Sequence, residues 1–424
     1  MVKDMPNKFS EVTPEIKELA KKCNKKIDEE LFAKYDVKRG LRKRNGEGVL
    51  AGLTDISMIN AYTMIDREIV PCEGKLYYRG IDIEDIVKGF IEEDRFGFEE
   101  TAYLLLFGEL PKKDQLKQFE GMLGEYRQLP TNFVRDIIMK APSCDMMNTL
   151  ARSVLTLFSY DDNASDISLP NVLRQCIQLI ALFPVLSVYA YQAYNHYERG
   201  ESLFIHLPDP ELSTAENILH LLRPDSKYTK LEAKLLDMAL VLHAEHGGGN
   251  NSTFTNVVIS STGTDIYSAI SGAIGSLKGP KHGGANLAVK KQMELVINEI
   301  GIHASELRIR QIVQDILDGD FNDHTGLIYG IGHAVYTLSD PRSEILAKQC
   351  EELSYEKFRH DEYEFYRKFS AIAIEEIYKR KGIHVCTNVD FYSGLVYDML
   401  GIPEDLYTLL FVIGRTVGWV AHNI

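Results

Sequence analysis

Apolar residues recur along most of this chain at intervals of three and four positions, which places them on one face of an α-helix. The spacing predicts helices over residues 230–244, 285–300 and 307–317. Another helix is expected within residues 96–108, where an apolar run ends in a glycine and a proline follows soon after. The pattern as a whole favours an all-α fold.

One segment is apolar almost throughout. Residues 179–191 carry hardly any polar side chain and include Pro184. The run is short for a membrane span, which needs about 20 residues. A helix that is apolar on all sides is buried in a large core or at a dimer interface. We therefore expect no membrane contact, and the run supports a homodimer.

Strand signals are few, and residues 74–80 (Gly-Lys-Leu-Tyr-Tyr-Arg-Gly) are the best candidate, as the edge of a hairpin. Residues 351–379 are charged, with apolar residues at helical intervals, and predict one or two exposed helices. Helical residues 283–393 are bracketed by glycine-rich segments. This predicts a small domain inserted into a larger one, formed by residues 1–282 and 394–424, with ligands in the cleft between them.

Composition narrows the class of partner. The chain has 424 residues, of which 45% are hydrophobic, and a formal charge of -14. This charge argues against nucleic acid or an anionic membrane as the main partner. The six cysteines form no CxxC pair, and the N-terminus lacks the apolar core of a signal peptide. Both features favour reduced thiols and a cytoplasmic location.

Three residues set in glycine-rich or turn-forming sequence carry the best chemical signal. They are His282 in Gly-Pro-Lys-His-Gly-Gly, His333 in Gly-Ile-Gly-His-Ala-Val, and Asp390 in Asn-Val-Asp-Phe-Tyr-Ser-Gly. Two imidazoles and one carboxylate can provide the base and the hydrogen-bond donors for proton removal beside a carbonyl. A lone histidine beside glycines is more often structural than catalytic. Two such sites and a carboxylate site shift the odds toward catalysis, and spacing alone leaves the two interpretations nearly balanced.

Other glycine-rich patterns fit known chemistry less well. His243 and His246 stand three residues apart, whereas a zinc helix needs four and a further ligand. His-Gly-Gly-Gly resembles an esterase oxyanion loop, but the chain has no Gly-x-Ser-x-Gly. Residues 272–284 and 330–335 fail the phosphate-loop and dinucleotide patterns. We expect His243 to cap a helix as a cation and His246 to contact a ligand.

Two arginines stand among apolar or turn residues instead of charge runs. Arg342 lies in Ser-Asp-Pro-Arg and Arg415 in Ile-Gly-Arg-Thr-Val-Gly-Trp. A guanidinium in such a place is suited to binding a carboxylate through two parallel hydrogen bonds. The alternative is a structural ion pair.

Together these segments resemble citrate synthase over most of the chain. The resemblance begins at residues 46–54, 77–83 and 98–111. It continues, in the same order, through the four segments that hold His246, His282, His333 and Asp390, and then reaches Arg415. It implies an all-α homodimer with a large and a small domain, and an acyltransferase that condenses acetyl-CoA with oxaloacetate to give citrate and CoA in the tricarboxylic acid cycle.

The resemblance also implies a role for each residue of the catalytic set. Asp390 would remove a proton from the acetyl methyl group. His282 would donate a hydrogen bond to the thioester oxygen as the enol forms. His333 would polarise the ketone of oxaloacetate and act as an acid. No metal or redox cofactor is needed, because the thioester itself acidifies the methyl group.

Substrate binding is implied for a second set of residues. His246, Arg342 and Arg415 would hold the carboxylates and the ketone of oxaloacetate. A loop of Gly330, Ile331 and Gly332 would contact acyl-CoA.

Two departures from the family accompany this resemblance. The family usually has an arginine beyond the last helix, and residues 420–424 contain none, which implies either a shortened chain or impaired activity. A basic residue common after the His333 position is replaced here by Tyr-Thr-Leu-Ser, and lysines at 278, 281, 290 or 291 are the alternatives for binding the CoA phosphates.

Two rival functions remain at this stage. The first is a 2-methylcitrate synthase that uses propionyl-CoA, since one methylene gives little discrimination. The second is a non-catalytic, oxaloacetate-binding helical dimer. Allosteric regulation and assembly beyond a dimer cannot be read from the sequence.

Overall fold

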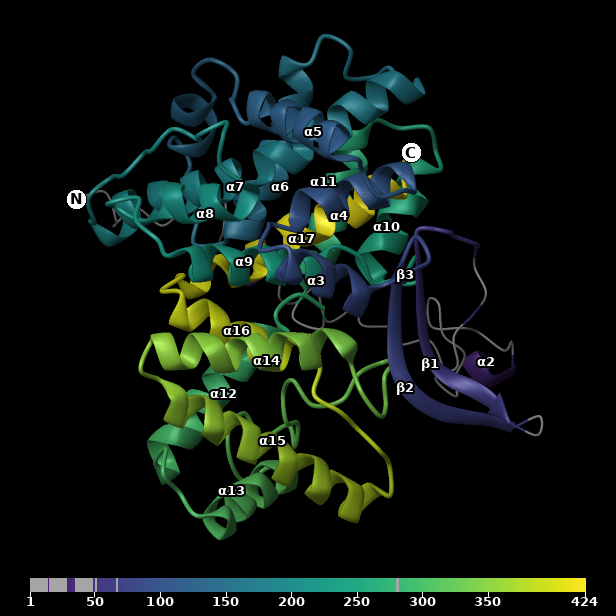
Figure 1. Ribbon diagram of the computed structural model, residues 1–424, viewed down its shortest axis with the longest axis vertical. Helices are drawn as coiled ribbons and strands as arrows, with labels where there is room; N and C mark the ends of the chain where they lie inside the picture. The colour runs from purple at the N-terminus through teal and green to yellow at the C-terminus, as the bar shows by residue number, and fades with distance from the viewer. Residues whose placement is uncertain (1–13, 15–28, 35–48, 50–51, 66–67, 280–281) are drawn as a thin grey trace. The chain divides into compact units, whose positions relative to one another are not determined.

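The structure is a computed structural model that describes residues 14, 29–34, 49, 52–65, 68–279 and 282–424 (Figure 1). The chain divides into two compact units, residues 1–52 and 53–424. The described part of the first unit includes the short helix α2 (Glu29–Lys34). Cys23 and Lys281 lie outside the described residues. All the predicted site residues belong to the second unit.

Helices dominate the second unit, which confirms the predicted all-α class. Its α-helices are α3 (Ile83–Glu92), α4 (Phe98–Phe107), α5 (Lys113–Tyr126), α6 (Met146–Leu157), α7 (Leu169–Arg199), α8 (Thr214–Leu222), α9 (Lys230–His243), α10 (Asn251–Ser260), α11 (Ile266–Lys278), α12 (Ala285–Ile300), α13 (Glu306–Asp318), α14 (Pro341–Glu356), α15 (His360–Lys381), α16 (Val389–Met399) and α17 (Tyr407–Ala421). Short π or 3-10 turns are η2 (Val134–Ile138), η3 (Phe158–Tyr160) and η4 (Glu404–Leu406).

A small antiparallel sheet accompanies the helices. Strands β1 (Ser57–Ile65), β2 (Glu68–Tyr78) and β3 (Ile81–Asp82) pair in that order, and Ser57 faces Tyr78. The predicted strand at residues 74–80 forms the end of β2 and the turn that follows it. The buried Tyr78 hydroxyl donates to the carbonyl oxygen of Glu245 at 3.1 Å. This contact ties the sheet to the end of α9.

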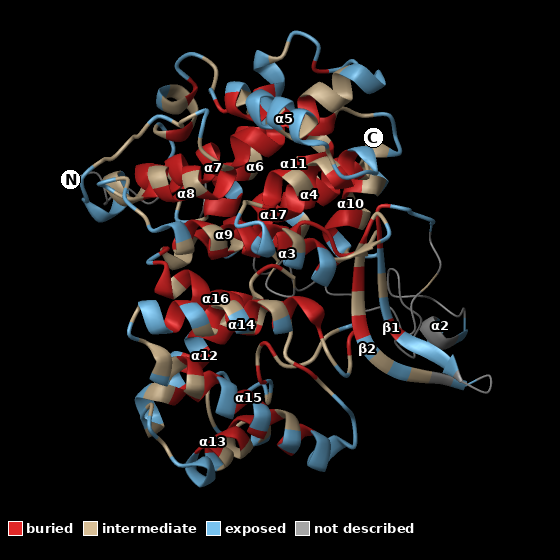
Figure 2. Ribbon diagram, in the orientation of Figure 1, coloured by how far each residue is buried: buried red, intermediate tan, exposed pale blue. Residues whose placement is uncertain are grey.

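The apolar run of residues 179–191 lies within α7, which is 31 residues long. This helix is long and apolar enough to cross a membrane by length and composition, but 78% of its most apolar window is buried inside the protein. Figure 2 shows the middle of this helix buried, while its two ends are exposed or half-buried. The run is therefore covered within one chain and does not itself provide an exposed dimer surface.

Helices α9 and α17 form the centre of the unit and position the site. Both are mainly buried, and they pack against each other (Figure 2). α9 begins with a capping box, in which Thr229 accepts from the backbone N–H of Glu232 and the Glu232 side chain accepts from the backbone N–H of Thr229. α17 also contacts α4, α7 and α11, so its polar residues are held by packing on several sides.

Helices α12 to α16 pack on one another within the region predicted to be a small domain. α14 and α12 contact α16, and α13 contacts α15. The predicted boundary at residue 393 falls inside α16, and α14 also contacts α9. The division into a large and a small domain stays a prediction.

The charged region 351–379 differs from its predicted exposure. It spans the end of α14 and most of α15, and α15 buries one face that includes Phe365, Phe369 and Ala373. The prediction of one or two helices is confirmed, with two observed, but the prediction that they are exposed is wrong for that face. The apolar residues at helical intervals form this buried stripe, and most of the charged residues lie on the opposite face.

Candidate active site

His246 follows α9 in a tight turn. Gly247 has a φ of 84°, a conformation that glycine adopts readily, and it turns the chain directly after His246. The His246 ring is buried, and its Nε2 has no hydrogen-bond partner among the described residues. Burial, together with the charge of Arg342, holds the pKa of His246 well below its ordinary value, so the ring is neutral.

His333 lies beside His246, although the two are far apart in the sequence. The centroids of their rings are 5.1 Å apart, and Tyr336 stacks on His333 at 4.9 Å. The Nδ1 atom of His333 accepts hydrogen bonds from the backbone N–H groups of Val335 and Tyr336, at 3.0 and 3.1 Å. A ring nitrogen that accepts carries no proton, so the proton of the neutral ring is on Nε2. His333 can therefore donate from Nε2.

Arg415 offers an open guanidinium in the middle of α17. Its side chain is fully buried, and Nε donates to the carbonyl oxygen of His243 at 2.8 Å. Nη1 and Nη2 have no hydrogen-bond partner in the described part of the chain. Burial lowers the pKa of Arg415 to about 10, although the negative charge of Glu245 opposes this shift. The group therefore remains a cation at neutral pH. Two open donors on a buried cation suit a carboxylate.

Arg342 is paired within the protein instead. It is the second residue of α14, and its Nε and Nη2 donate to Asp340 at 3.0 and 2.7 Å. Asp340 also caps the helix by accepting from the backbone N–H of Arg342. The guanidinium lies over the ring of Tyr336 at 5.8 Å. The alternative of a structural ion pair is thus observed for Arg342, whereas Arg415 has none among the described residues.

Asp390 stands in the first turn of α16, where the side chain of Asn388 accepts its backbone N–H at 3.0 Å. Burial and the charge of Asp340 raise the pKa of Asp390 to about 6, although the arginines 342 and 415 oppose this rise. A carboxylate with a raised pKa is a stronger base than an ordinary aspartate. Asn388 also donates to the carbonyl oxygens of Gly330, from its backbone N–H at 2.9 Å, and of Gly332, from its side chain at 2.8 Å, so the turn that holds Asp390 is tied to the loop before His333.

His282 approaches the cluster from the loop before α12. Its Nε2 lies 3.1 Å from Oδ1 of Asn250 and 3.0 Å from Oγ of Ser252. Its ring contacts Phe411, over which the Arg415 guanidinium lies at 4.8 Å. Burial and the charge of Arg415 lower the pKa of His282 to about 4, so this ring is also neutral at pH 7.

The loop of Gly330, Ile331 and Gly332 is fixed to the segment that precedes Asp390. The backbone N–H of Gly332 donates to Cys386 at 2.8 Å, and that of Asn388 donates to Gly330 at 2.9 Å. Gly330 and Gly332 have positive φ angles of 77° and 95°. The loop predicted to contact acyl-CoA therefore lies next to the start of α16.

Several residues of the site were not found from the sequence. Tyr336 contacts both His246 and His333, Glu245 is a buried carboxylate beside His246, and Ser252 bonds to His282. The Asn-Asn-Ser run after the three glycines was the available signal for Ser252. Nothing in the local sequence marks Tyr336, because its role depends on contacts with α9 and β2.

The prediction for His243 is wrong. Its Nε2 lies 3.1 Å from the hydroxyl of Tyr397, and the side chain is fully buried at the end of α9. Burial and the charge of Arg342 hold its pKa well below the ordinary value. His243 is therefore a neutral core residue and not a cationic helix cap.

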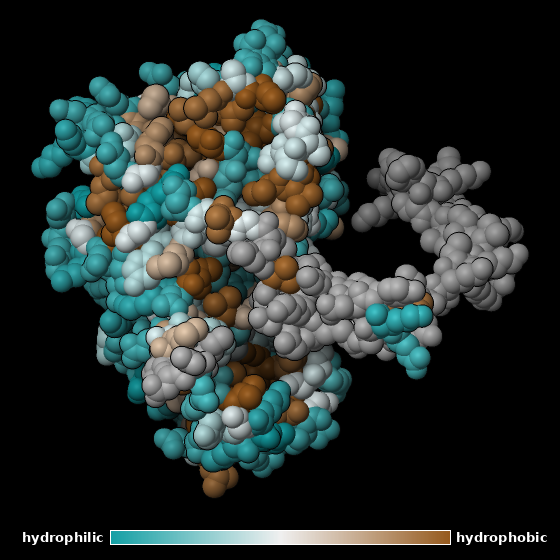
Figure 3. All heavy atoms as spheres, turned by 90° about the vertical axis from the view of Figure 1, so that its right-hand side faces the viewer, coloured by the Kyte–Doolittle hydropathy of each residue, from teal (hydrophilic) through white to brown (hydrophobic). Residues whose placement is uncertain are grey.

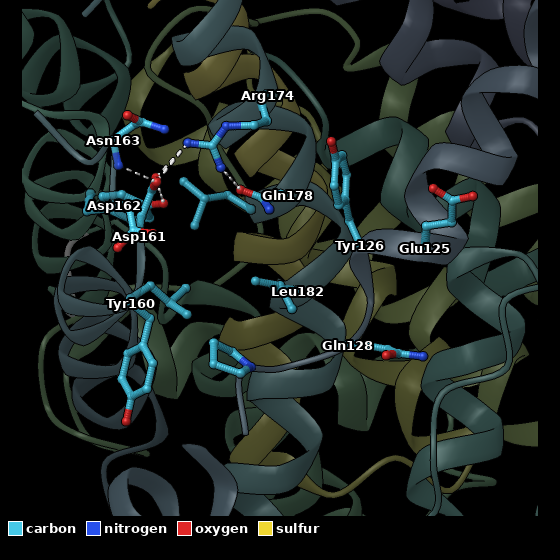
Figure 4. Close-up of a pocket in the computed structure, with 14 residues that line it drawn as sticks. Glu125, Tyr126, Gln128, Tyr160, Asp161, Asp162, Asn163, Arg174, Gln178 and Leu182 are labelled. Carbon is cyan, nitrogen blue, oxygen red and sulfur yellow. Dashed lines mark hydrogen bonds and ion pairs between the residues drawn. The ribbon is translucent and has the colours of Figure 1, made fainter. Parts of the chain in front are cut away.

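A separate cavity of about 430 Å³ lies away from this cluster (Figure 4). Leu182 and Tyr126 line it, together with Asp161 and Arg174. Asp161 accepts hydrogen bonds from Arg174 and Tyr267, so these polar groups are already paired with each other. None of the predicted site residues lines the cavity.

The cluster thus joins neutral histidines, a basic carboxylate and a buried cation, groups that are chemically able to remove a proton beside a carbonyl and to bind a carboxylate. The family model described as the C-terminal domain of citrate synthase matches residues 40–424. A citrate synthase of Haloferax volcanii is 36% identical over 389 residues, which cover 90% of this chain and 91% of that protein. A 2-methylcitrate synthase of Corynebacterium glutamicum is 32% identical over 393 residues, or 92% and 91% of the two chains.

Solved structures agree with these relatives. Citrate synthase of Thermoplasma acidophilum, in a ternary complex with carboxymethyl coenzyme A and oxaloacetate, has a TM-score of 0.72 to this chain. The two are 26% identical, and the match covers 88% of this chain and 89% of that one. The chain belongs to the citrate synthase family and is an acyltransferase.

Proposed function

We propose that the protein condenses acetyl-CoA with oxaloacetate and water to give citrate and CoA. The observation that carries this proposal is that the protein holds both a buried guanidinium with unpartnered donors, at Arg415, and a carboxylate whose pKa is raised to about 6, at Asp390. The first suits a carboxylate of the substrate, and the second suits removal of a weakly acidic proton. Family membership supports the same reaction.

Oxaloacetate binding falls to Arg415, Arg342 and His246. Arg415 presents two unpartnered donors, and a ligand carboxylate would satisfy both. Asp340 balances the charge of Arg342 and accepts from its Nε and Nη2. The remaining N–H groups of the guanidinium contribute to oxaloacetate binding. The neutral ring of His246 adds a hydrogen bond without adding charge.

Proton removal is assigned to Asp390 with assistance from His282. Asp390 takes a proton from the methyl group of acetyl-CoA while negative charge moves to the thioester oxygen. His282 can stabilise that oxygen if Nδ1 carries the ring proton. Nε2 then accepts from the Ser252 hydroxyl, 3.0 Å away, which turns to it from Oδ1 of Asn250, its present acceptor at 2.8 Å. One donor aimed at such an oxygen contributes about 3 kcal/mol to transition-state stabilisation.

The carbon–carbon bond then forms between the enol carbon and the ketone of oxaloacetate. His333 donates from Nε2 to the ketone oxygen, which becomes the hydroxyl of citryl-CoA. Water finally hydrolyses the citryl thioester, releasing citrate and CoA. These steps need no metal or redox cofactor, because each is a proton transfer or an acyl reaction that side chains can assist.

Propionyl-CoA is the second candidate for the acyl substrate. The 2-methylcitrate synthase relative, which is similar over nearly the whole chain, favours this alternative. A pocket distinguishes one methylene group by only about 1–3 kcal/mol. Turnover with the two acyl-CoA substrates should be compared under identical conditions, and we expect acetyl-CoA to be preferred.

We further propose a cytoplasmic homodimer that serves the tricarboxylic acid cycle. The five cysteines that the structure describes are free thiols, which agrees with a reducing compartment.

Leu155 on α6 and Val258 on α10 are both 48% exposed, and these helices flank α11 in one layer. Apolar atoms also gather over the upper part of the face in Figure 3. A second copy would cover such a layer.

The assay of the proposed reaction is direct. Purified full-length protein is supplied with acetyl-CoA and oxaloacetate, free CoA is measured with a thiol reagent, and the organic product is identified by mass spectrometry. Stoichiometric citrate and CoA are expected. Release of CoA without citrate would identify the protein as a thioesterase and contradict the proposal.

A further inference from the structure

Glu245 is fully buried and lies just after α9, between His243 and His246 in the sequence. Its Oε1 accepts hydrogen bonds from the Ser57 hydroxyl at 2.9 Å and from the backbone N–H of Gly247 at 2.7 Å. His422 Nε2 lies 3.3 Å from the same oxygen. The second oxygen, Oε2, has no hydrogen-bond partner among the residues that the structure describes. Oε1 of Glu245 thus fixes the turn through its hydrogen bonds, whereas Oε2 does not.

Helix α17 lies directly against this turn. Arg415 bonds to the carbonyl of His243, and the backbone N–H of Gly418 donates to the carbonyl of Ala244 at 3.1 Å. A Cβ at position 418 would collide with Oε2 of Glu245. The carboxylate therefore rests on the surface of α17, one turn from Arg415. Glycine at position 418 makes this approach possible.

Glu245 and Arg415 both contact the junction of α9 and α17, but no hydrogen bond or ion pair joins their side chains in the described structure. Oε2 of Glu245 and both Nη groups of Arg415 are all without partners in the described structure. A buried charge without compensation is very unfavourable, and an opposite charge nearby reduces this cost. Arg342 shows the other arrangement, in which Asp340 occupies two of its donors.

We propose that Glu245 is a positioning residue that supplies the counter-charge for Arg415 without bonding to its Nη groups, so that both remain open for a ligand carboxylate. Its hydrogen bonds to Ser57 and Gly247 hold the charge at this place. The same charge repels an anionic ligand, so Glu245 also limits how tightly the site holds oxaloacetate. This second consequence rests on the proposed function, whereas the pairing with Arg415 does not.

The first test uses the ligand-free, full-length protein. Glu245→Gln keeps the size of the side chain and an acceptor oxygen for Ser57 and Gly247, but removes the charge. It should lower the thermal midpoint clearly more when Arg415 is present than in the Arg415→Met background, where only His422 remains beside the carboxylate. Equal losses in both backgrounds would overturn the proposal, because the carboxylate would then act only through its own packing.

The second test is calorimetric titration with oxaloacetate, and it stays decisive if Arg415→Met does not fold. Glu245→Gln should bind oxaloacetate about tenfold more tightly than the wild type, since a repelling charge is gone. Glu245→Asp, which keeps the charge but shortens its reach to Gly247, should bind more weakly. Weaker or unchanged binding by Glu245→Gln would overturn the inference. Absence of binding by the wild type would contradict the proposed function, while the double-mutant comparison would still decide the role of Glu245.

Discussion

Burial acts in opposite directions on the acid and the imidazole that are proposed to work together. It raises the pKa of Asp390 to about 6 and lowers that of His282 to about 4. Burial disfavours the charged form of each, which is the ionised form of an acid and the protonated form of a histidine. Above pH 6, the carboxylate is ionised and the ring is neutral. These are the forms that the proposed proton removal requires.

The pH dependence of turnover follows from these values. Asp390 is active as a base when ionised, so kcat/KM should rise with pH and level off above about pH 6. Below that value it should fall about tenfold per pH unit. Steady-state assays between pH 4.5 and 8, corrected for irreversible unfolding, would measure this limb. A rate that stays constant down to pH 5 would contradict a base with a raised pKa, because an ordinary aspartate titrates near 3.8.

Sequence patterns identified the residues proposed to contact substrate better than the residues that hold them in place. His246, Arg415 and Asp390 stand in marked local sequence, next to glycines or within an apolar helix. Glu245 and Ser57 are 188 positions apart, and their hydrogen bond exists only because β1 reaches the turn after α9. Such contacts depend on tertiary packing, which local spacing does not encode.

At the scale of elements, helix periodicity predicted the bounds of several helices well. The prediction for residues 285–300 coincides with α12, and the prediction for residues 230–244 ends one residue beyond α9. β1 and most of β2 were missed, since their polar and apolar residues do not alternate cleanly and one long hairpin has many exposed positions. The buried face of α15 was missed because charges dominate its sequence.

The glycine loop beside α16 provides a test at this scale. A Cβ at Gly330 would meet side-chain atoms of Val289 and Phe391, whereas a Cβ at Gly332 meets nothing within 4 Å. Both glycines have positive φ, so Gly332→Ala is the matched control for backbone strain alone. Gly330→Ala should destabilise the protein by about 1–3 kcal/mol more than Gly332→Ala. Urea denaturation would measure the difference, and equal losses would contradict the close packing of this loop.

At the scale of the whole molecule, the apolar layer of α6, α10 and α11 predicts self-association. Leu155→Asp alters a half-exposed residue of that layer and should shift the protein from dimer to monomer. Phe358→Asp is the control, because Phe358 is 97% exposed in the connection between α14 and α15, outside the layer. Light scattering at micromolar concentration would distinguish the species. A wild-type monomer would contradict the proposed dimer.

Binding of the two substrates should also be coupled. Arg342 is the second residue of α14, and Arg415 lies in α17. A dianion such as oxaloacetate that contacts both arginines therefore favours the arrangement in which the two side chains are close. Oxaloacetate should therefore strengthen binding of a CoA thioether analogue by about 1–3 kcal/mol, and Arg342→Ala should reduce both the oxaloacetate affinity and this coupling. Calorimetric titrations with and without oxaloacetate would measure it. Equal affinities in the two titrations would mean that the sites are independent.

The most direct test of the account is turnover by Asp390→Asn, measured together with oxaloacetate binding in the same preparation. Asparagine is nearly isosteric, so the variant should fold and bind oxaloacetate at least as well as the wild type. It cannot accept the methyl proton, and citrate formation from acetyl-CoA should fall by a factor of about 10²–10⁴. Retained binding with lost turnover would agree with a site built around Asp390 as its base. Unchanged turnover would show that another group removes the proton and would contradict the proposed mechanism.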